Sequence, residues 1–162
     1  MEADHQHPAG EDKAPNYFIS ALKCKCPRCR RGDLFETNNT YALKNSKFMR
    51  MNEKCSVCGQ PTELEVGFYY GTSYVAYALT VAFSVATFIA WKVFFGISFD
   101  INDNNIFWWF GVNAILLIIF QPYFMRVSRS FWLSFYVKYN KNWRLEKPEQ
   151  YERLNKDFSN GW

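Results

Sequence analysis

The residues of this chain with the clearest capacity for chemistry are its five cysteines, at positions 24, 26, 29, 55 and 58. Four of them form two Cys-x-x-Cys pairs, Cys26 with Cys29 and Cys55 with Cys58, separated by twenty-five residues. Two pairs at this separation are typical of a structural zinc site, in which each pair presents two thiolates to a tetrahedral Zn²⁺. An odd number of cysteines in two tight clusters argues against a disulfide framework.

The residues around the two pairs predict a zinc ribbon over residues 21–66. Pro27, Gly32 and Gly59 supply the turn backbone that such pairs require, and the stretch YALKNSKFMRMNEK between the pairs could form short β-strands. A unit of about forty residues with few large aliphatic side chains cannot fold by burial alone. Metal binding would therefore supply the missing folding free energy.

Two questions about the thiols stay open at this point. A four-cysteine iron site is the main competitor of zinc. Cys24, the fifth thiol, is either a bystander or a labile extra ligand that would make a C-x-C-x-x-C metal-transfer site. Because the protein would supply all four ligands, catalytic zinc, which keeps a coordination position open, is not expected.

Two apolar segments, at residues 73–95 and 106–124, are long enough to cross a membrane. The first spans about 34 Å as a helix, against a hydrocarbon core of about 30 Å. Its one charged residue is Lys92, and the second segment has none. Neither shows the polar face expected of a helix in a soluble bundle. With the short acidic connection between them, they predict a transmembrane helical hairpin over residues 67–125.

The basic residues predict the orientation of this hairpin. Ten Lys and Arg residues precede the first segment, eight follow the second, and the connection between them has none. By the positive-inside rule, both termini lie in the cytoplasm, where reducing conditions favour metal binding over disulfides. The predicted interfacial aromatic residues are Trp108 and Trp109 on the outer side, and Tyr69, Tyr70, Tyr74 and Tyr123 on the inner side.

The apolar segments also suggest how the two helices pack. A row of small residues on the first segment is expected to meet small residues on the second; the two sets are Ala78, Ala82, Ala86 and Ala90, and Gly111 and Ala114. Asn113 is strongly polar and lies deep in the second segment. We expect it to form a hydrogen bond with Ser84 or Thr87, which is a packing role rather than a transport role.

The two ends of the chain are rich in charge. Residues 1–20 are expected to be a disordered tail, with no secretory signal peptide. Residues 126–162 form a basic, aromatic cytoplasmic tail that is expected to be partly helical. Its sequence RVSRSFWLSFYVKYNKNWR suggests a C-terminal interfacial helix, either lying on the membrane or docking a partner.

Four sequence blocks together resemble the domain-of-unknown-function 983 family, in the form seen in Bacteroidetes. They are CPRCRRGDLF, FMRMNEKCSVCG, GFYYGTSYVAYAL and FMRVSRSFW, and the resemblance runs from about Lys23 to Tyr139. It implies a bacterial inner-membrane protein with two spans and with Cys26, Cys29, Cys55 and Cys58 as metal ligands. It implies no catalytic residues. The chain departs from the usual ribbon pattern at Arg30, where glycine commonly follows the second cysteine.

These features predict a non-catalytic accessory subunit or assembly factor of a larger membrane complex, which uses its ribbon to bind a cytoplasmic partner and has no small-molecule substrate. The alternative is a metal-handling factor that delivers copper or zinc to a membrane enzyme. Nucleic-acid binding is not expected, because nine acidic residues nearly balance the ten basic ones before the first span. No nucleophile–base constellation or phosphate-binding glycine loop suggests an enzyme.

Overall fold

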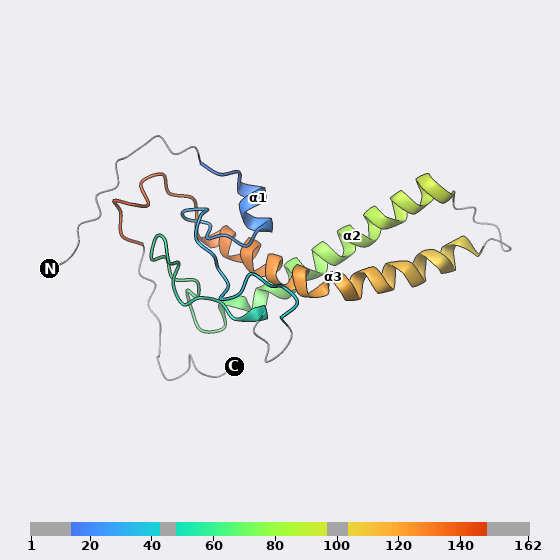
Figure 1. The fold of residues 1–162 in the computed structure, drawn as a ribbon, viewed down its shortest axis with the longest axis horizontal. Helices are drawn as coiled ribbons and strands as arrows, with labels where there is room; N and C mark the ends of the chain where they lie inside the picture. The colour runs from blue at the N-terminus through green and yellow to red at the C-terminus, as the bar shows by residue number, and fades with distance from the viewer. Residues whose placement is uncertain (1–13, 43–47, 97–103, 149–162) are drawn as a thin grey trace.

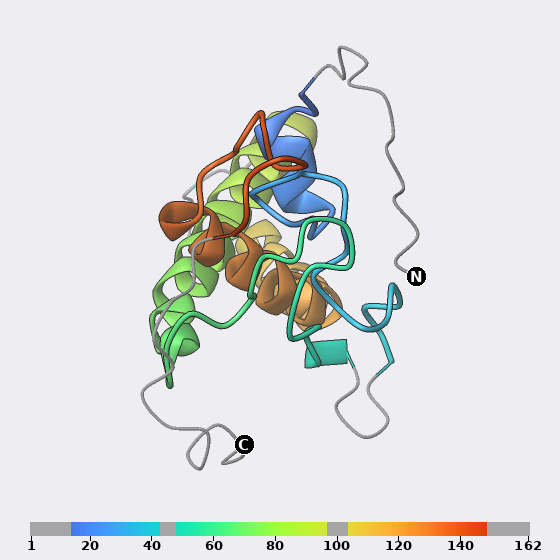
Figure 2. The same ribbon diagram turned by 90° about the vertical axis from the view of Figure 1, so that its left-hand side faces the viewer.

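The computed structural model describes residues 14–42, 48–96 and 104–148. Its elements, in order, are α1 (Tyr17–Leu22), the 3₁₀-helix η2 (Phe68–Gly71), α2 (Thr72–Phe95) and α3 (Asn105–Tyr136). Helices α2 and α3 run side by side as an arm that extends from a head (Figure 1). We define the head as residues 14–42, 48–71 and 126–148. Seen from the head, α3 lies between α2 on one side and α1 with the cysteine-bearing segments on the other (Figure 2).

The two long helices contain the two predicted apolar segments. Helix α2 begins one residue before the predicted segment and ends with it, where Gly96 adopts a positive φ of 67°. Helix α3 begins at Asn105 and continues through Pro122. Both helices are long and apolar enough to span a membrane.

Hydrogen bonds between polar side chains and contacts between aromatic rings join α2 to α3. Asn113 is buried, and its Oδ1 accepts a hydrogen bond from Thr87 Oγ1 at 2.9 Å, while its Nδ2 donates to Ser84 Oγ at 3.4 Å. The ring centroid of Phe83 lies 5.5 Å from that of Phe124. The predicted hydrogen bonding of Asn113 is confirmed, with both expected partners engaged.

The predicted contact between the small residues of the two helices is wrong. Ala78, Ala82, Ala86 and Ala90 lie on the exposed face of α2, and Gly111 and Ala114 on the exposed face of α3. An added Cβ at Gly111 would meet nothing within 4 Å. Ser84 and Thr87 lie on a different face of α2, and it is this face that turns toward α3. The reason is that a buried amide requires polar partners, so Asn113 selects the face that carries hydroxyl groups.

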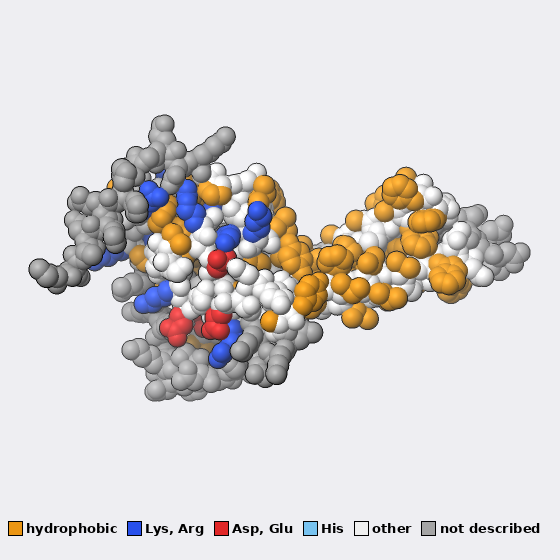
Figure 3. Space-filling view, viewed as in Figure 1, with side chains coloured by type: hydrophobic (Ala, Val, Ile, Leu, Met, Phe, Trp, Pro, Cys, Tyr) orange, Lys and Arg blue, Asp and Glu red, His pale blue; other side chains and the backbone are white. Residues whose placement is uncertain are grey.

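The apolar side chains of the arm cover its surface. Val93 of α2 is 74% exposed and Ile118 of α3 is 75% exposed. Hydrophobic side chains dominate the visible face of the arm, whereas charged side chains gather on the head (Figure 3). Monomeric soluble proteins rarely expose so continuous an apolar surface, and the apolar helices of a soluble bundle would be buried.

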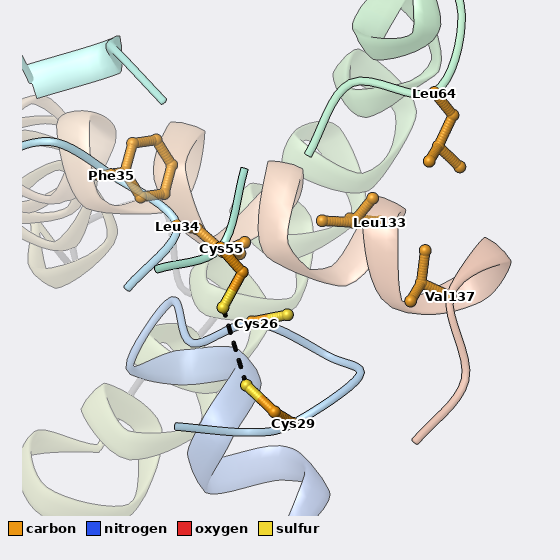
Figure 4. Close-up of a cluster of buried hydrophobic side chains, with 8 residues drawn as sticks. All are labelled: Cys26, Cys29, Leu34, Phe35, Cys55, Leu64, Leu133 and Val137. Atoms are coloured by element: carbon orange, nitrogen blue, oxygen red, sulfur yellow. Dashed lines mark hydrogen bonds between the residues drawn. The ribbon is translucent and has the colours of Figure 1, made fainter. Parts of the chain in front are cut away.

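The core of the head includes the end of α3. Cys26, Cys29 and Cys55 cluster with side chains from residues 34–64 and from the end of α3 and the residue after it (Figure 4). These side chains are Leu34, Phe35, Leu64, Leu133 and Val137. The ribbon expected over residues 21–66 therefore does not have a core of its own. Among the described residues it also lacks the expected β-strands, because pairing is limited to isolated bridges such as Phe35 with Met51.

Helix α3 does not end where the predicted second span ends. It has 32 residues and runs without a break to Tyr136, so the separate C-terminal interfacial helix expected after residue 125 is not seen in the described part of the chain. Ser128, Ser130 and Leu133 are buried in the head. At about 1.5 Å per residue, α3 is about 48 Å long, and its last third serves as the central support of the head.

The basic and aromatic side chains at this end of α3 contact the rest of the head. Arg126 donates to the Thr37 carbonyl, and Arg129 donates to the Met49 carbonyl at 3.1 Å. Trp132 Nε1 donates to the Phe68 carbonyl at 2.8 Å. These three side chains were expected to face a membrane surface or a partner. In the structure, they join α3 to the rest of the head.

Helix α1 lies partly within residues 1–20, where the sequence predicted a disordered tail, so that prediction is wrong for residues 17–20. Asn16 caps α1 by accepting a hydrogen bond from the Phe18 N–H at 3.0 Å. The ring of Tyr17 packs against that of Phe131 on α3, with centroids 6.4 Å apart. Residues 1–13 and 149–162 lie outside the described part of the chain.

The junction between head and arm depends on a close approach at Gly71. A Cβ added there would overlap the indole ring of Trp132, and this rigid ring is held by its hydrogen bond to Phe68. We expect Gly71→Ala to lower stability by about 1–3 kcal/mol, as for other overpacked sites. Thermal unfolding of the detergent-solubilised protein measures this. Gly111→Ala is the matched control, because its added methyl group meets no neighbour; equal melting temperatures for the two variants would contradict the prediction.

Candidate metal centre

Each Cys-x-x-Cys pair folds into a tight turn that is closed by its own backbone. In the first turn, the Cys26 N–H donates to the Gly32 carbonyl at 2.8 Å and the Arg30 N–H donates to the Cys26 carbonyl at 2.7 Å. In the second turn, the Cys55 N–H donates to the Gln60 carbonyl at 2.8 Å, and the Gly59 N–H donates to the Cys55 carbonyl at 2.9 Å. We call these two turns the first and second knuckles.

Both knuckles require left-handed backbone at the residue after the second cysteine. Gly59 has φ +69° and Arg30 has φ +57°. Glycine adopts this conformation freely, whereas other residues lose about 1–2 kcal/mol. Arg30 has compensating contacts: its guanidinium donates to the Pro15 carbonyl at 2.7 Å and lies over the ring of Tyr139 at 4.5 Å. Arg30 thus keeps the turn that glycine usually forms, and it also links the segment before the cysteines to the segment after α3.

The two knuckles bring four sulfur atoms together. Cys26 Sγ lies 3.6 Å from Cys58 Sγ, and Cys29 Sγ lies 3.7 Å from Cys55 Sγ. All four sulfurs lie within 4.8 Å of one another. A tetrahedral zinc site with Zn–S bonds of about 2.3 Å has sulfurs about 3.8 Å apart, whereas a disulfide needs about 2.05 Å. The cluster therefore fits a metal such as zinc.

Hydrogen bonds among the four sulfurs shift the pKa values of the thiols in opposite directions. Cys26, Cys29 and Cys55 are buried, and Cys58 is partly buried. Hydrogen bonding to Cys29 raises the pKa of the Cys26 thiol, and the same interaction lowers the pKa of Cys29. The hydrogen bond with Cys26 also helps to lower the pKa of Cys55 to about 7. Because the thiolate is the form that binds metals, the lowered pKa values favour metal binding at Cys29 and Cys55.

A backbone N–H and an arginine side chain support the four cysteines. The Gly32 N–H points to Cys29 Sγ at 3.5 Å. Arg28 is only 4% exposed, and it donates to the Cys58 carbonyl at 3.1 Å and to the Glu146 carbonyl at 2.6 Å. Four thiolates around a divalent cation would carry net negative charge, which a buried guanidinium beside them offsets.

Cys24 lies outside this group of sulfurs. Its carbonyl accepts a hydrogen bond from the Leu34 N–H at 3.1 Å. Burial raises the pKa of its thiol to about 11. This placement agrees with the interpretation of Cys24 as a bystander.

The sequence did not reveal the contribution of the C-terminal segment to the site. Residues 137–148 pass over the first knuckle, where the Asn140 N–H donates to the Arg28 carbonyl at 3.1 Å. Arg31 lies over the ring of Trp143 at 5.7 Å. No local pattern in the sequence could have indicated these contacts, because they join residues more than a hundred positions apart.

Comparisons with protein-family models, curated proteins and solved structures give no match for this chain. The resemblance to the domain-of-unknown-function 983 family therefore stays a prediction.

Gly32 gives a direct test of the site. An added Cβ at this position would overlap Cys55 Sγ, and the clash would displace one ligand. We expect Gly32→Ala to weaken zinc binding by about 10- to 100-fold, the range seen when the support of a metal ligand is removed. Competition with a chromophoric chelator measures the affinity.

The control for this experiment is Cys24→Ser, which should leave both the affinity and the zinc content unchanged. If Gly32→Ala binds zinc as tightly as the wild-type protein, the four sulfurs are not the ligands in this arrangement.

Proposed function

We propose that this chain is a non-catalytic protein of a bacterial inner membrane, acting as an accessory subunit or assembly factor of a larger membrane complex. In this proposal α2 and α3 form a transmembrane hairpin, and the head lies in the cytoplasm with both termini and a structural Zn²⁺. The observation that carries the proposal is the position of the four sulfurs: they converge inside a core that the head shares with α3.

The arrangement of the sulfurs supports a structural metal rather than a catalytic one. Four cysteine ligands complete a tetrahedral coordination shell and leave no position for a substrate or a water molecule. When bound, zinc would cross-link the two knuckles. The surrounding residues then have structural tasks: Arg28 offsets charge, Gly32 allows the close approach of Cys55, and Leu133 joins the cluster to the membrane helix.

The surface of the arm supports membrane insertion. Helix α2 has 24 residues, which reach about 36 Å and exceed a hydrocarbon core of about 30 Å. The described residues of the arm carry one basic side chain, Lys92, next to its outer end, where it can reach the interface. The basic residues on both sides of the hairpin support a cytoplasmic head.

A recess on the head supports partner binding. It has a volume of about 390 Å³ and lies beside the second knuckle, between Arg28 and the segment after α3. Lys138, Lys141 and Lys147 line it, with Glu146 as the one acidic residue. A surplus of positive charge in a recess favours a negatively charged partner segment. The exposed lysines do not hold the head together, so their charge is available for this contact.

Metal delivery is the weaker alternative. A transfer site would require Cys24 to exchange with Cys26 or Cys29 as a ligand, but its thiol lies outside the cluster.

Co-purification tests the proposal. The tagged full-length protein is extracted from its native membrane with a mild detergent, and the proteins that accompany it are identified. We expect wild-type protein to bring down defined membrane-complex subunits, and Lys138→Glu with Lys141→Glu to lose them several-fold, because the charge of the recess is reversed.

Lys54→Glu is the matched control, because Lys54 is exposed on the head and does not line the recess. We expect this control to bring down the same partners as the wild-type protein. Recovery of wild-type protein only as a lone monomer would contradict the proposal.

A further inference from the structure

Helix α1 presents large apolar side chains to the outside of the head. Phe18 is 64% exposed, Ile19 54% and Leu22 43%, whereas Ser20 and Ala21 are buried against the head. We call Phe18, Ile19 and Leu22 the α1 patch. A six-residue helix that buries its small residues and exposes its large apolar ones gains nothing from this arrangement in water. The patch therefore indicates a surface that water does not cover.

Two contacts fix the position of α1 along α3. Tyr123 Oη donates to the Leu22 carbonyl at 3.1 Å, and the ring of Tyr17 packs on that of Phe131. Helix α1 thus runs along α3 between residues 123 and 131. Leu22 lies at the last turn of the predicted span 106–124, so the α1 patch continues the apolar surface of the arm.

The dimensions of a bilayer place this patch in its interfacial layer. A hydrocarbon core of about 30 Å within a total thickness of about 40–45 Å leaves an interfacial layer of about 5–8 Å on each side. Phe18 precedes Leu22 by about one helical turn, or about 6 Å. If Leu22 lies at the edge of the core, Phe18 and Ile19 lie within the layer where amphipathic helices rest.

Side chains at the same depth as the α1 patch are of the types found at membrane interfaces. Along α2, Gly71 lies beside Trp132 of α3 and Phe83 lies beside Phe124 of α3. Tyr74 and Tyr77 of α2 therefore lie beside the part of α3 between residues 124 and 132. Both tyrosines are exposed. Lys23, also exposed, directly follows the patch. Tyrosine is enriched at membrane interfaces, and a lysine there can reach the lipid phosphates.

We infer that the α1 patch is a second membrane contact, which inserts into the headgroup layer of the cytoplasmic leaflet and holds the head against the bilayer. This inference rests on the proposed transmembrane hairpin. Its partner is the lipid itself, because the patch is continuous with the apolar surface of the arm and lies at the depth of the interface. The head then has one fixed orientation on the membrane, with the recess at residues 136–147 turned toward the cytoplasm.

Site-specific photo-cross-linking tests this contact. The full-length protein, with p-benzoylphenylalanine in place of Phe18, is reconstituted into vesicles of phosphatidylethanolamine and phosphatidylglycerol and irradiated. Matched controls carry the probe in place of Ile118, which is exposed on the arm, or Val57, which is exposed on the second knuckle. Zinc content verifies that each variant is folded. Mass spectrometry identifies the adducts.

We expect lipid adducts from positions 18 and 118, in yields several-fold higher than from position 57. Lipid adducts at 118 with none at 18 would overturn the inference and leave the transmembrane hairpin standing. No lipid adducts at either position would contradict the hairpin itself. Adducts at position 18 between copies of the chain would assign the patch to a second copy and also overturn the inference.

Discussion

The fold of the head depends on the convergence of four cysteine sulfurs in a core that also contains the end of α3. Few large aliphatic side chains are available there: Leu34 and Leu64 come from the segments around the cysteines, Leu133 comes from α3, and Val137 follows its last residue. Burial on this scale cannot hold loops that lack strands among the described residues. A metal held by the four sulfurs, which are spaced as a tetrahedral site requires, would supply the missing constraint. Gly32 lets the two knuckles approach closely enough to form this site.

This shared core joins the head to the arm through packed side chains as well as through the chain itself. Helix α3 runs unbroken from the arm into the head, and Arg126, Arg129 and Trp132 donate hydrogen bonds to backbone carbonyls of the surrounding segments. Long basic side chains next to an apolar span are usually read as a solvated flank. Here they satisfy carbonyl groups that have no strand partner. A partner that binds the head would therefore meet a surface with a fixed orientation relative to the hairpin.

The features that the sequence predicted are those that local spacing determines. The Cys-x-x-Cys pairs and the two apolar segments specify a four-sulfur cluster and two long helices, and a buried amide at Asn113 demands hydroxyl partners. The features it did not predict depend on tertiary contacts. The row of alanines identifies one face of α2 but does not say what packs on it. The hydrogen bonds of Asn113 turn a different face of α2 toward α3. Likewise, the sequence did not show that α3 continues unbroken from the arm into the head, or that α1 packs against α3, because both depend on tertiary contacts.

Hydrogen exchange of the full-length protein in lipid nanodiscs, with and without a zinc chelator, tests the central claim most directly. If the metal organises the head and couples it to α3, chelation should remove protection together from the N–H groups of both knuckles and from the end of α3, including the Val137 N–H that donates to Leu133. The amides around Asn113 should stay protected. Unchanged protection at the knuckles and at residues 133–137 after the metal has been removed would contradict the account.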